Sequence, residues 1–194
     1  MKKLIGLTGK TGAGKSTVSS YLKENGVYII DGDVVARDIL SENPALIDEL
    51  VKAFGDILNS DGSLNRKALA KKAFSSEENT NLLNSVMHPA INDKISDMAN
   101  RAFEKYDIVV VDAAAIIESG FTKKCHKLIV VTAPVETRLK RIMARDNITY
   151  EDALVRINGQ KEDGFYISKA DYVVDTENGL TKETLEKLKE ELFN

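Results

Sequence analysis

The sequence of 194 residues has a single cysteine, no tryptophan, only three prolines and no large excess of charge of either sign. One cysteine, Cys125, cannot form an internal disulfide, which excludes a disulfide-stabilised secreted module and favours a reducing, cytoplasmic location. No apolar run approaches the roughly 20 residues of a membrane-spanning helix, and the first residues lack the apolar core of a signal peptide. A net charge of −3 gives no general attraction to nucleic acid or to an anionic membrane. We therefore expect one soluble domain without a nucleic-acid, membrane or obligate protein partner, in which local charge binds any anionic ligand.

Five short apolar runs, rich in valine and isoleucine, predict the strands of the fold. They do not alternate apolar with polar residues, which is typical of parallel strands covered on both faces, and helical patterns separate them. The sequence therefore predicts an α/β fold with a doubly wound, five-stranded parallel sheet. The predicted strands are Leu4–Thr8, Val27–Ile30, Asp107–Val111, Leu128–Thr132 and Tyr172–Val174.

The connection between the second and third predicted strands is too long for an ordinary loop. It contains three helix-start signals: Asn43 before Pro44, Asn65, and a Ser-x-x-Glu capping box in Ser75-Ser76-Glu77-Glu78. We expect a helical insertion at about 35–105.

A second helical elaboration is expected at about 135–169, with a weaker cap signal at Thr149. At the end of the chain, Lys182–Leu192 places three leucines on one stripe of an amphipathic helix. The core of the single domain would then consist of residues 1–34, 106–134 and 170–194.

A phosphate-binding motif follows the first predicted strand directly. Gly9-Lys10-Thr11-Gly12-Ala13-Gly14-Lys15-Ser16 fits G-x-x-x-x-G-K-[ST], a P-loop, and a helical pattern comes next. The glycines let backbone N–H groups point at phosphate oxygens, Lys15 would reach the β- and γ-phosphates, and the Ser16 hydroxyl would bind Mg²⁺. The same glycines do not fit G-x-G-x-x-G, which disfavours a dinucleotide cofactor. The candidate nucleotide-binding residues are Thr11, Gly12, Ala13, Gly14, Lys15, Ser16 and Thr17.

The motif alone does not distinguish a kinase from an ATPase or a switch GTPase. The sequence contains neither D-x-x-G nor N-K-x-D, which disfavours a switch GTPase, and its length leaves little room for a coupled motor. A small-molecule kinase with ATP as co-substrate fits best. A nucleotide-gated binding protein without an acceptor is the rival from another class.

Carboxylates follow two of the predicted strands. Asp31 and Asp33 come after the second strand and Asp112 closes the third, and in an open parallel sheet these ends lie beside the phosphate motif. Asp33 is the candidate general base for an attacking hydroxyl, although one of Asp31 and Asp33 could instead cap the next helix. Asp112 would order the water shell of Mg²⁺, or it is an ordinary strand-end carboxylate.

Three arginines, Arg138, Arg141 and Arg145, are spaced to share one face of a helix. We expect them to project from a mobile lid and to hold transferring phosphates, because guanidinium groups suit phosphate and lid closure excludes water. A solvated basic helix face is the alternative. The neighbouring face of that helix, expected to pack, consists of Val135, Leu139, Ile142 and Met143.

Two stretches inside the long connection are more specific than the phosphate motif: Asp61-Gly62-Ser63-Leu64-Asn65-Arg66 and His88-Pro89-Ala90-Ile91. Together with the phosphate motif and Asp31-Gly32-Asp33, they make nearly the whole chain resemble the dephospho-CoA kinase family. Members of this family transfer the γ-phosphate of ATP to the ribose 3′-hydroxyl of dephospho-CoA, the last step of coenzyme A biosynthesis.

The resemblance implies that ATP and dephospho-CoA are the substrates, with Mg²⁺, that the insertion binds the CoA moiety and that residues 135–169 form the lid. A nucleoside or nucleotide kinase with another hydroxyl or phosphate acceptor is the alternative function. From the residues alone, His88 before Pro89 could equally occupy a helix N-cap. The implied roles are Asp33 as catalytic base; Lys15, Arg141 and Arg145 at the phosphates; and Asp33, Arg37, Arg66 and His88 on the substrate side.

The chain departs from the family pattern in four places. Asp112–Glu118 lacks the proline and leucines of D-x-P-L-L-x-E, and Arg138 replaces a glutamine. Lys161–Tyr166 carries acids where the family is often basic, and Thr176 replaces an asparagine. These changes bear on the substrate pocket and the lid contacts more than on phosphoryl transfer.

Overall fold

The computed structural model describes residues 2–193. The chain forms two compact units. The first consists of Met1–Asp31 and Met98–Asn194, and the second of Gly32–Asp97. The insertion was predicted at about 35–105. That it binds substrate, and that residues 135–169 act as a lid, remain predictions.

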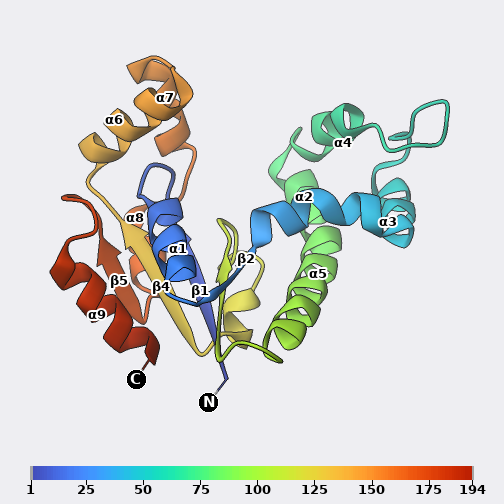
Figure 1. Ribbon diagram of the computed structural model, residues 1–194. Helices are drawn as coiled ribbons and strands as arrows, with labels where there is room; N and C mark the ends of the chain where they lie inside the picture. The colour runs from blue at the N-terminus through green and yellow to red at the C-terminus, as the bar shows by residue number, and fades with distance from the viewer. Residues whose placement is uncertain (1, 194) are drawn as a thin grey trace. The chain divides into compact units, whose positions relative to one another are not determined.

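The first unit is built on a five-stranded, fully parallel sheet in the order β2-β3-β1-β4-β5 (Figure 1). The predicted fold class and all five predicted strands are confirmed. In the register, Leu7 of β1 pairs with Asp112 of β3, and Asp112 pairs with Asp31 of β2. The carboxyl ends of neighbouring strands therefore meet at one edge of the sheet. The strands are β1 Lys3–Gly9, β2 Tyr28–Asp31, β3 Ile108–Asp112, β4 Lys127–Thr132 and β5 Tyr172–Asp175.

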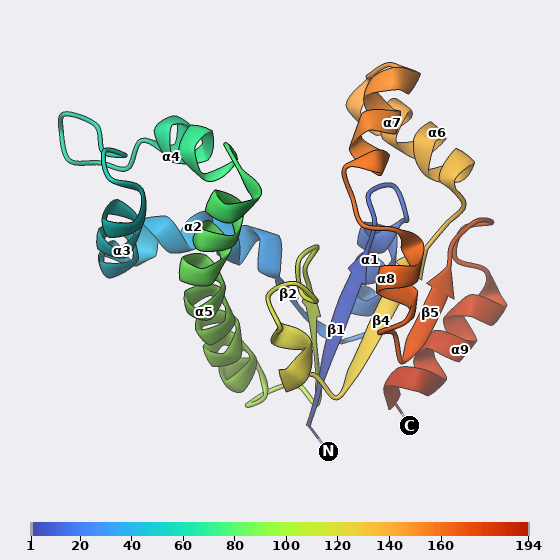
Figure 2. The ribbon, with the colours of Figure 1, turned by 180° about the vertical axis from the view of Figure 1, so that it is seen from behind.

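Helices cover both faces of this sheet, as the two opposite views show (Figures 1 and 2). Helices α1 (Lys15–Glu24) and α9 (Lys182–Phe193) pack on one face, where Leu22 and Leu188 join the buried strand residues in one apolar cluster. The other face carries α8 (Asp163–Ile167) and the connection after β3, which includes the 3₁₀ helix η1 (Phe121–Lys124). The predicted C-terminal amphipathic helix is confirmed as α9.

Helices α6 (Val135–Asp146) and α7 (Tyr150–Asn158) form an antiparallel pair with a small core of its own. Thr149 caps α7 by accepting a hydrogen bond from the Asp152 N–H at 3.2 Å, as its spacing predicts. The core of the pair consists of Leu139, Ile142, Ala153 and Ile157.

The second unit is helical, as predicted for the long connection. Its helices are α2 (Gly32–Glu42), α3 (Pro44–Phe54), α4 (Arg66–Ala73) and the greater part of α5 (Glu77–Ala102), which continues into the first unit. The side chains of Asn43 and Asn65 cap α3 and α4 as predicted. At α5 the capping residue is Ser76, whose hydroxyl accepts from the Asn79 N–H at 3.1 Å, and not Ser75 of the predicted capping box.

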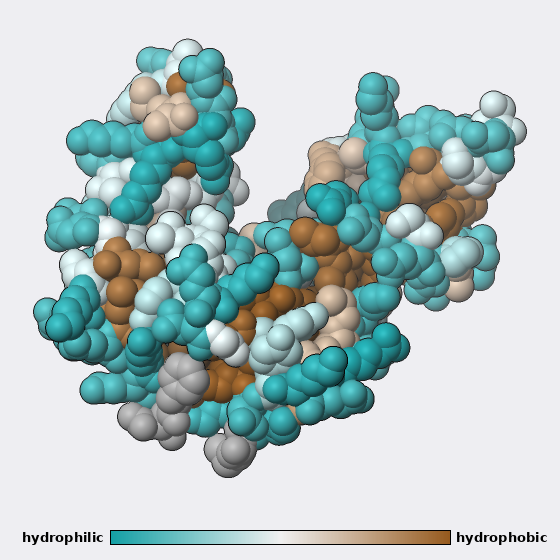
Figure 3. All heavy atoms as spheres, in the orientation of Figure 1, coloured by the Kyte–Doolittle hydropathy of each residue, from teal (hydrophilic) through white to brown (hydrophobic). Residues whose placement is uncertain are grey.

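Within the described residues, no helix is both long and apolar enough to cross a membrane. The space-filling view shows hydrophilic side chains over much of the visible surface of each unit, with smaller apolar areas between them (Figure 3).

Candidate active site

The phosphate-binding loop connects β1 to α1. Gly12 and Gly14 adopt left-handed backbone conformations with φ of 77° and 88°, which side chains with a Cβ rarely adopt, and Gly14 is the N-cap of α1. At Gly9 a Cβ would lie 2.5 Å from the backbone oxygen of Val131, so only glycine allows β1 to approach β4 there. Ser16 and Thr17 are exposed in the first turn of α1, where N–H groups and the helix dipole favour phosphate.

Lys15 and Asp112 form the central ion pair of the loop. The Lys15 amine donates to one oxygen of Asp112, and the buried Ser19 hydroxyl donates to the other. The side chains of Lys15 and Asp112 are 19% and 14% exposed. Asp112 is therefore fixed by partners from α1 at the carboxyl end of β3. The motif did not indicate Ser19, since the residue lies one helical turn beyond Lys15.

The arrangement of the arginines in α6 differs from the prediction. Arg138 is 1% exposed and does not project; Val135, expected to pack, is 41% exposed. The prediction that Arg138 projects was wrong. Helix α8, which is distant in the sequence, covers that side of α6, and Asp163 Oδ1 lies 3.6 Å from Arg138 Nη1. Arg145 is exposed, as predicted, and its Nε donates to Asp146 at 2.8 Å. This bond raises the pKa of Arg145.

Arg141 lies against the phosphate-binding loop. Its Nη1 donates to the Gly12 carbonyl at 3.3 Å and to the Thr176 hydroxyl at 2.9 Å, and its Nη2 donates to the Thr176 carbonyl at 2.5 Å. The buried Thr176 hydroxyl in turn donates to the Ala13 carbonyl at 2.6 Å. The sequence does not predict this role of Thr176, because nothing in its local sequence indicates a contact 163 residues away.

Two further side chains hold the outer turn of the loop and were not predicted to do so. Gln160 accepts a hydrogen bond from the Thr11 N–H at 2.9 Å. Asp163 forms an ion pair with Lys10 at 3.0 Å. Gln160 lies between α7 and α8, and Asp163 is the first residue of α8.

Of the remaining candidate residues, Asp31 belongs to the first unit and the others lie in the second unit. Asp33 is in the first turn of α2, inside the helix, and Asp31 is the last residue of β2, directly before that helix. The Arg66 guanidinium donates to the Arg37 carbonyl at 3.3 Å, so these two substrate-side candidates adjoin each other. His88 lies within α5, so the alternative of a helix N-cap was wrong.

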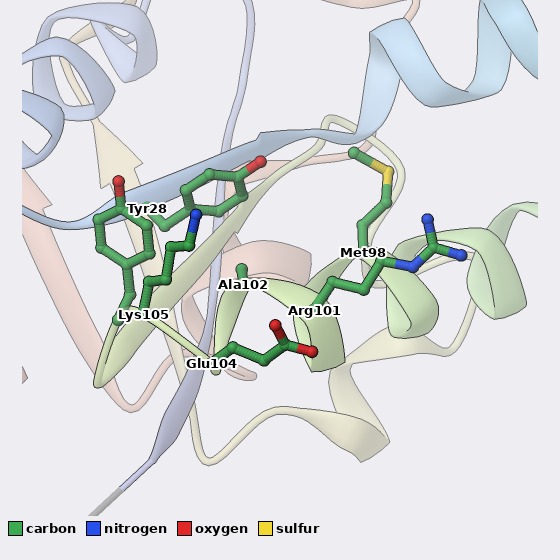
Figure 4. A pocket seen from close by; sticks show the side chains of 7 residues that line it. Tyr28, Met98, Arg101, Ala102, Glu104 and Lys105 are labelled. Atoms are coloured by element: carbon green, nitrogen blue, oxygen red, sulfur yellow. The ribbon is translucent and has the colours of Figure 1, made fainter.

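A pocket of about 710 Å³ lies in another part of the first unit (Figure 4). It is lined by Tyr28 and by residues of the end of α5 and the following turn, including Arg101 and Lys105. Tyr28 begins β2, whereas the phosphate loop follows the carboxyl end of β1. In a parallel sheet the amino ends of the strands lie opposite their carboxyl ends, so the pocket is separate from the phosphate loop.

Comparison with known proteins identifies the family. The family model described as dephospho-CoA kinase matches residues 3–182. The chain belongs to the dephospho-CoA kinase family. The match includes the phosphate loop, Asp112, the α6 arginines and the whole second unit.

Curated relatives agree over nearly their full length. The dephospho-CoA kinase of Corynebacterium glutamicum is 42% identical over 178 residues, which cover 91% of this chain and 89% of the relative. That of Listeria innocua is 39% identical over 184 residues, covering 94% and 92%.

Solved structures show the same fold. TT1252 from Thermus thermophilus superposes with a TM-score of 0.79 at 30% identity, covering 98% of this chain and 95% of the other. Dephospho-CoA kinase from Campylobacter jejuni gives 0.70 at 28%, covering 100% and 98%. Shikimate kinase from Acinetobacter baumannii, at 18% identity and 0.52, covers 97% and 92% and shares the fold alone.

Proposed function

We propose that this chain carries out the reaction of its family, the transfer of the γ-phosphate of ATP to the ribose 3′-hydroxyl of dephospho-CoA. Membership of a kinase family makes ATP the co-substrate. The observation that carries the proposal is that one family match, over residues 3–182, includes both the phosphate loop and the helical unit. A phosphate loop alone would leave the acceptor open. The predicted cytoplasmic location stays a prediction.

Lys15 is the proposed cation at the transferring phosphate. In the structure its amine is bound to Asp112, only part-buried, at the start of α1. A phosphate group is a second anion that can replace the carboxylate as partner of this amine, so the lysine need not pass through an unpaired state. Positive charge held at the β- and γ-phosphates then stabilises the charge that develops during transfer.

The Ser16 hydroxyl and the Asp112 carboxylate, which lie beside Lys15 in the sequence or in its ion pair, are oxygen ligands that fit Mg²⁺. Magnesium prefers oxygen ligands, keeps several of its waters and commonly uses one or two protein ligands together with phosphates. The Ser16 hydroxyl is exposed at the start of α1 and would be a direct ligand. Both oxygens of Asp112 already accept from protein donors, so Asp112 would act through water. When bound, Mg²⁺ would neutralise charge on the phosphate oxygens.

Asp33 is the proposed catalytic base, which would accept the proton of the attacking 3′-hydroxyl. The side chain belongs to the first turn of α2, the helix that follows β2 directly in the sequence. An aspartate in this role orients the hydroxyl as well as accepting its proton. Arg37, Arg66 and His88 remain the proposed substrate-side residues in the same helical unit.

Arg141 and Arg145 are proposed as further phosphate contacts with unequal roles. The Arg141 guanidinium already lies on the loop through Gly12, where it also holds the backbone. Arg145, at the last turn of α6, is bound to Asp146 and would have to exchange that partner for phosphate.

The test of the function is ADP release from ATP and Mg²⁺ in three parallel reactions. One contains dephospho-CoA, one a panel of nucleosides and nucleoside monophosphates, and one water alone. We expect turnover well above the water rate with dephospho-CoA only, and a product that carries the phosphate on the 3′-oxygen. No stimulation by dephospho-CoA would refute the proposal, and stimulation by a nucleoside or its monophosphate would favour the alternative kinase.

A further inference from the structure

We propose that Gln160, Asp163 and Arg138 form a latch that fixes the outer turn of the phosphate-binding loop, Lys10–Gly12, and that they act as positioning residues for ATP. This inference rests on the proposed function, because it takes the loop to be the site of the ATP phosphates. All of the residues involved belong to the first unit.

The first contact is a hydrogen bond to the loop backbone. The Thr11 N–H donates to Gln160 Oε1 at 2.9 Å, and Gln160 comes directly after Gly159, the C-cap of α7. The next loop residue, Gly12, has a left-handed φ of 77°. A bond to the preceding N–H restricts the backbone where this unusual conformation begins.

The second contact is an ion-paired cluster centred on Asp163. One oxygen of this carboxylate lies 3.0 Å from Lys10 Nζ and 3.6 Å from Arg138 Nη1. The side chains of Lys10 and Arg138 are 9% and 1% exposed, although that of Asp163 is 48% exposed. Asp163 is the ion-pair partner that the structure gives the buried Arg138 guanidinium within the described residues, so loss of this carboxylate should open the cluster.

Arg138 also touches the loop through its backbone. A Cβ on Gly12 would lie 2.8 Å from the backbone oxygen of Arg138, so the two main chains are in direct contact. The cavity beside the guanidinium measures about 10 Å³, no more than one water molecule occupies. A phosphate group does not fit there, so Arg138 acts through Asp163 and Gly12 and does not touch the nucleotide.

The three latch residues come from both ends of the α6–α7 pair. Arg138 lies in the first turn of α6, whereas Gln160 and Asp163 follow the end of α7. Both ends of the pair are therefore attached to the same turn of the phosphate loop. Loss of the latch should loosen the ATP site without altering the groups proposed to bind the acceptor.

The experiment compares Gln160→Met and Asp163→Asn with Glu162→Gln, a matched change at the neighbouring residue, which makes no side-chain cap bond. Calorimetry gives the Kd for ADP, steady-state kinetics gives kcat and both KM values, and thermal unfolding confirms that each variant is folded. We expect Gln160→Met to raise the ADP Kd and the KM for ATP about three- to tenfold, the worth of one hydrogen bond. Asp163→Asn should raise them about tenfold or more. The KM for dephospho-CoA should stay within about twofold, as should every constant of Glu162→Gln.

Folded variants that bind ADP like the unmodified chain would overturn the inference, whatever their melting temperatures, because the contacts would then be structural only. Tighter ADP binding by Asp163→Asn would also overturn it, since Asp163 would be restraining Lys10 from the phosphates. If Asp163→Asn does not fold, Gln160→Met decides alone. ADP binding needs no acceptor. Failure to phosphorylate dephospho-CoA would therefore refute the proposed function, whereas the ADP Kd values would still test this inference.

Discussion

The substitution Thr176→Val tests how far the phosphate-binding loop depends on one buried hydroxyl. Thr176 is 2% exposed, and its hydroxyl donates to the Ala13 carbonyl at 2.6 Å while accepting from Arg141 Nη1 at 2.9 Å. Valine keeps nearly the same shape and replaces the hydroxyl with a methyl group, which neither donates nor accepts a hydrogen bond. A Cβ built on Gly14 would lie 3.1 Å from this oxygen, so the hydroxyl also packs against the N-cap of α1.

The cost follows from the groups that lose a partner. The carbonyl of Ala13, a buried residue, loses the Thr176 hydroxyl as its donor. Arg141 is only half-buried, and it keeps its bonds to the Gly12 carbonyl and to the Thr176 carbonyl. Leaving one buried polar group unsatisfied costs about 1–3 kcal/mol. For a chain of this size, 1 kcal/mol lowers Tm by about 2–4 °C, so we expect a fall of roughly 2–12 °C.

Thermal unfolding and calorimetric ADP binding measure the two consequences. We expect the lower Tm together with a three- to tenfold rise in the ADP Kd, since Ala13 and Gly14 lose a support within the loop itself. Thr122→Val, at a half-buried threonine of η1, is the matched control and should change neither value. A Tm within about 1 °C of the unmodified chain together with an unchanged Kd would refute the reasoning.

Three further predictions address the base, the core and the cysteine. Asp33→Asn should lower kcat about 10²-fold or more with an unchanged ADP Kd, and a near-normal kcat would remove Asp33 from its role. Leu188→Ala, at a fully buried position of α9, should lower the free energy of unfolding by about 3–5 kcal/mol in denaturant titrations, whereas Val155→Ala, at a side chain that is 71% exposed, should cost under about 0.5 kcal/mol. Burial raises the pKa of Cys125 to about 12, so at pH 8 only about one thiol in 10⁴ is ionised, and its reaction with a disulfide reagent should be slow in the folded protein, quicken about tenfold per pH unit and become fast on unfolding. Equal rates for folded and unfolded protein would contradict the Cys125 prediction.

The elements whose signals are local were predictable from the sequence. The Asn43 cap is an example. Its side-chain oxygen accepts from the N–H three residues further on, so the sequence pattern of the cap is the same wherever the helix lies in the fold. The parallel strands were equally readable, since burial on both faces requires continuous apolar runs.

The side-chain contacts around the phosphate loop could not be predicted in this way. Helical spacing places Arg138 on a face of α6 but does not say what packs against that face, and here it is α8, which follows 25 residues later. The bonds of Gln160 and Thr176 join residues 149 and 163 positions apart. No periodicity or cap motif encodes such pairs, and the departures of the chain from the family pattern were the only sign that this region differs.

Two lysines of one loop have different expected roles because their counter-ions lie in different places. Lys15 is paired with Asp112 at the carboxyl end of β3, where the β- and γ-phosphates are proposed to bind, so a phosphate can take the place of the carboxylate. Lys10 is paired with Asp163, the first residue of α8, and its side chain is 9% exposed. If the proposed roles hold, we expect phosphate arriving at the loop to compete for Lys15 and not for Lys10. In the proposed scheme the first pair would supply a cation for catalysis and the second a fixed loop, and neither role depends on the net charge of the molecule.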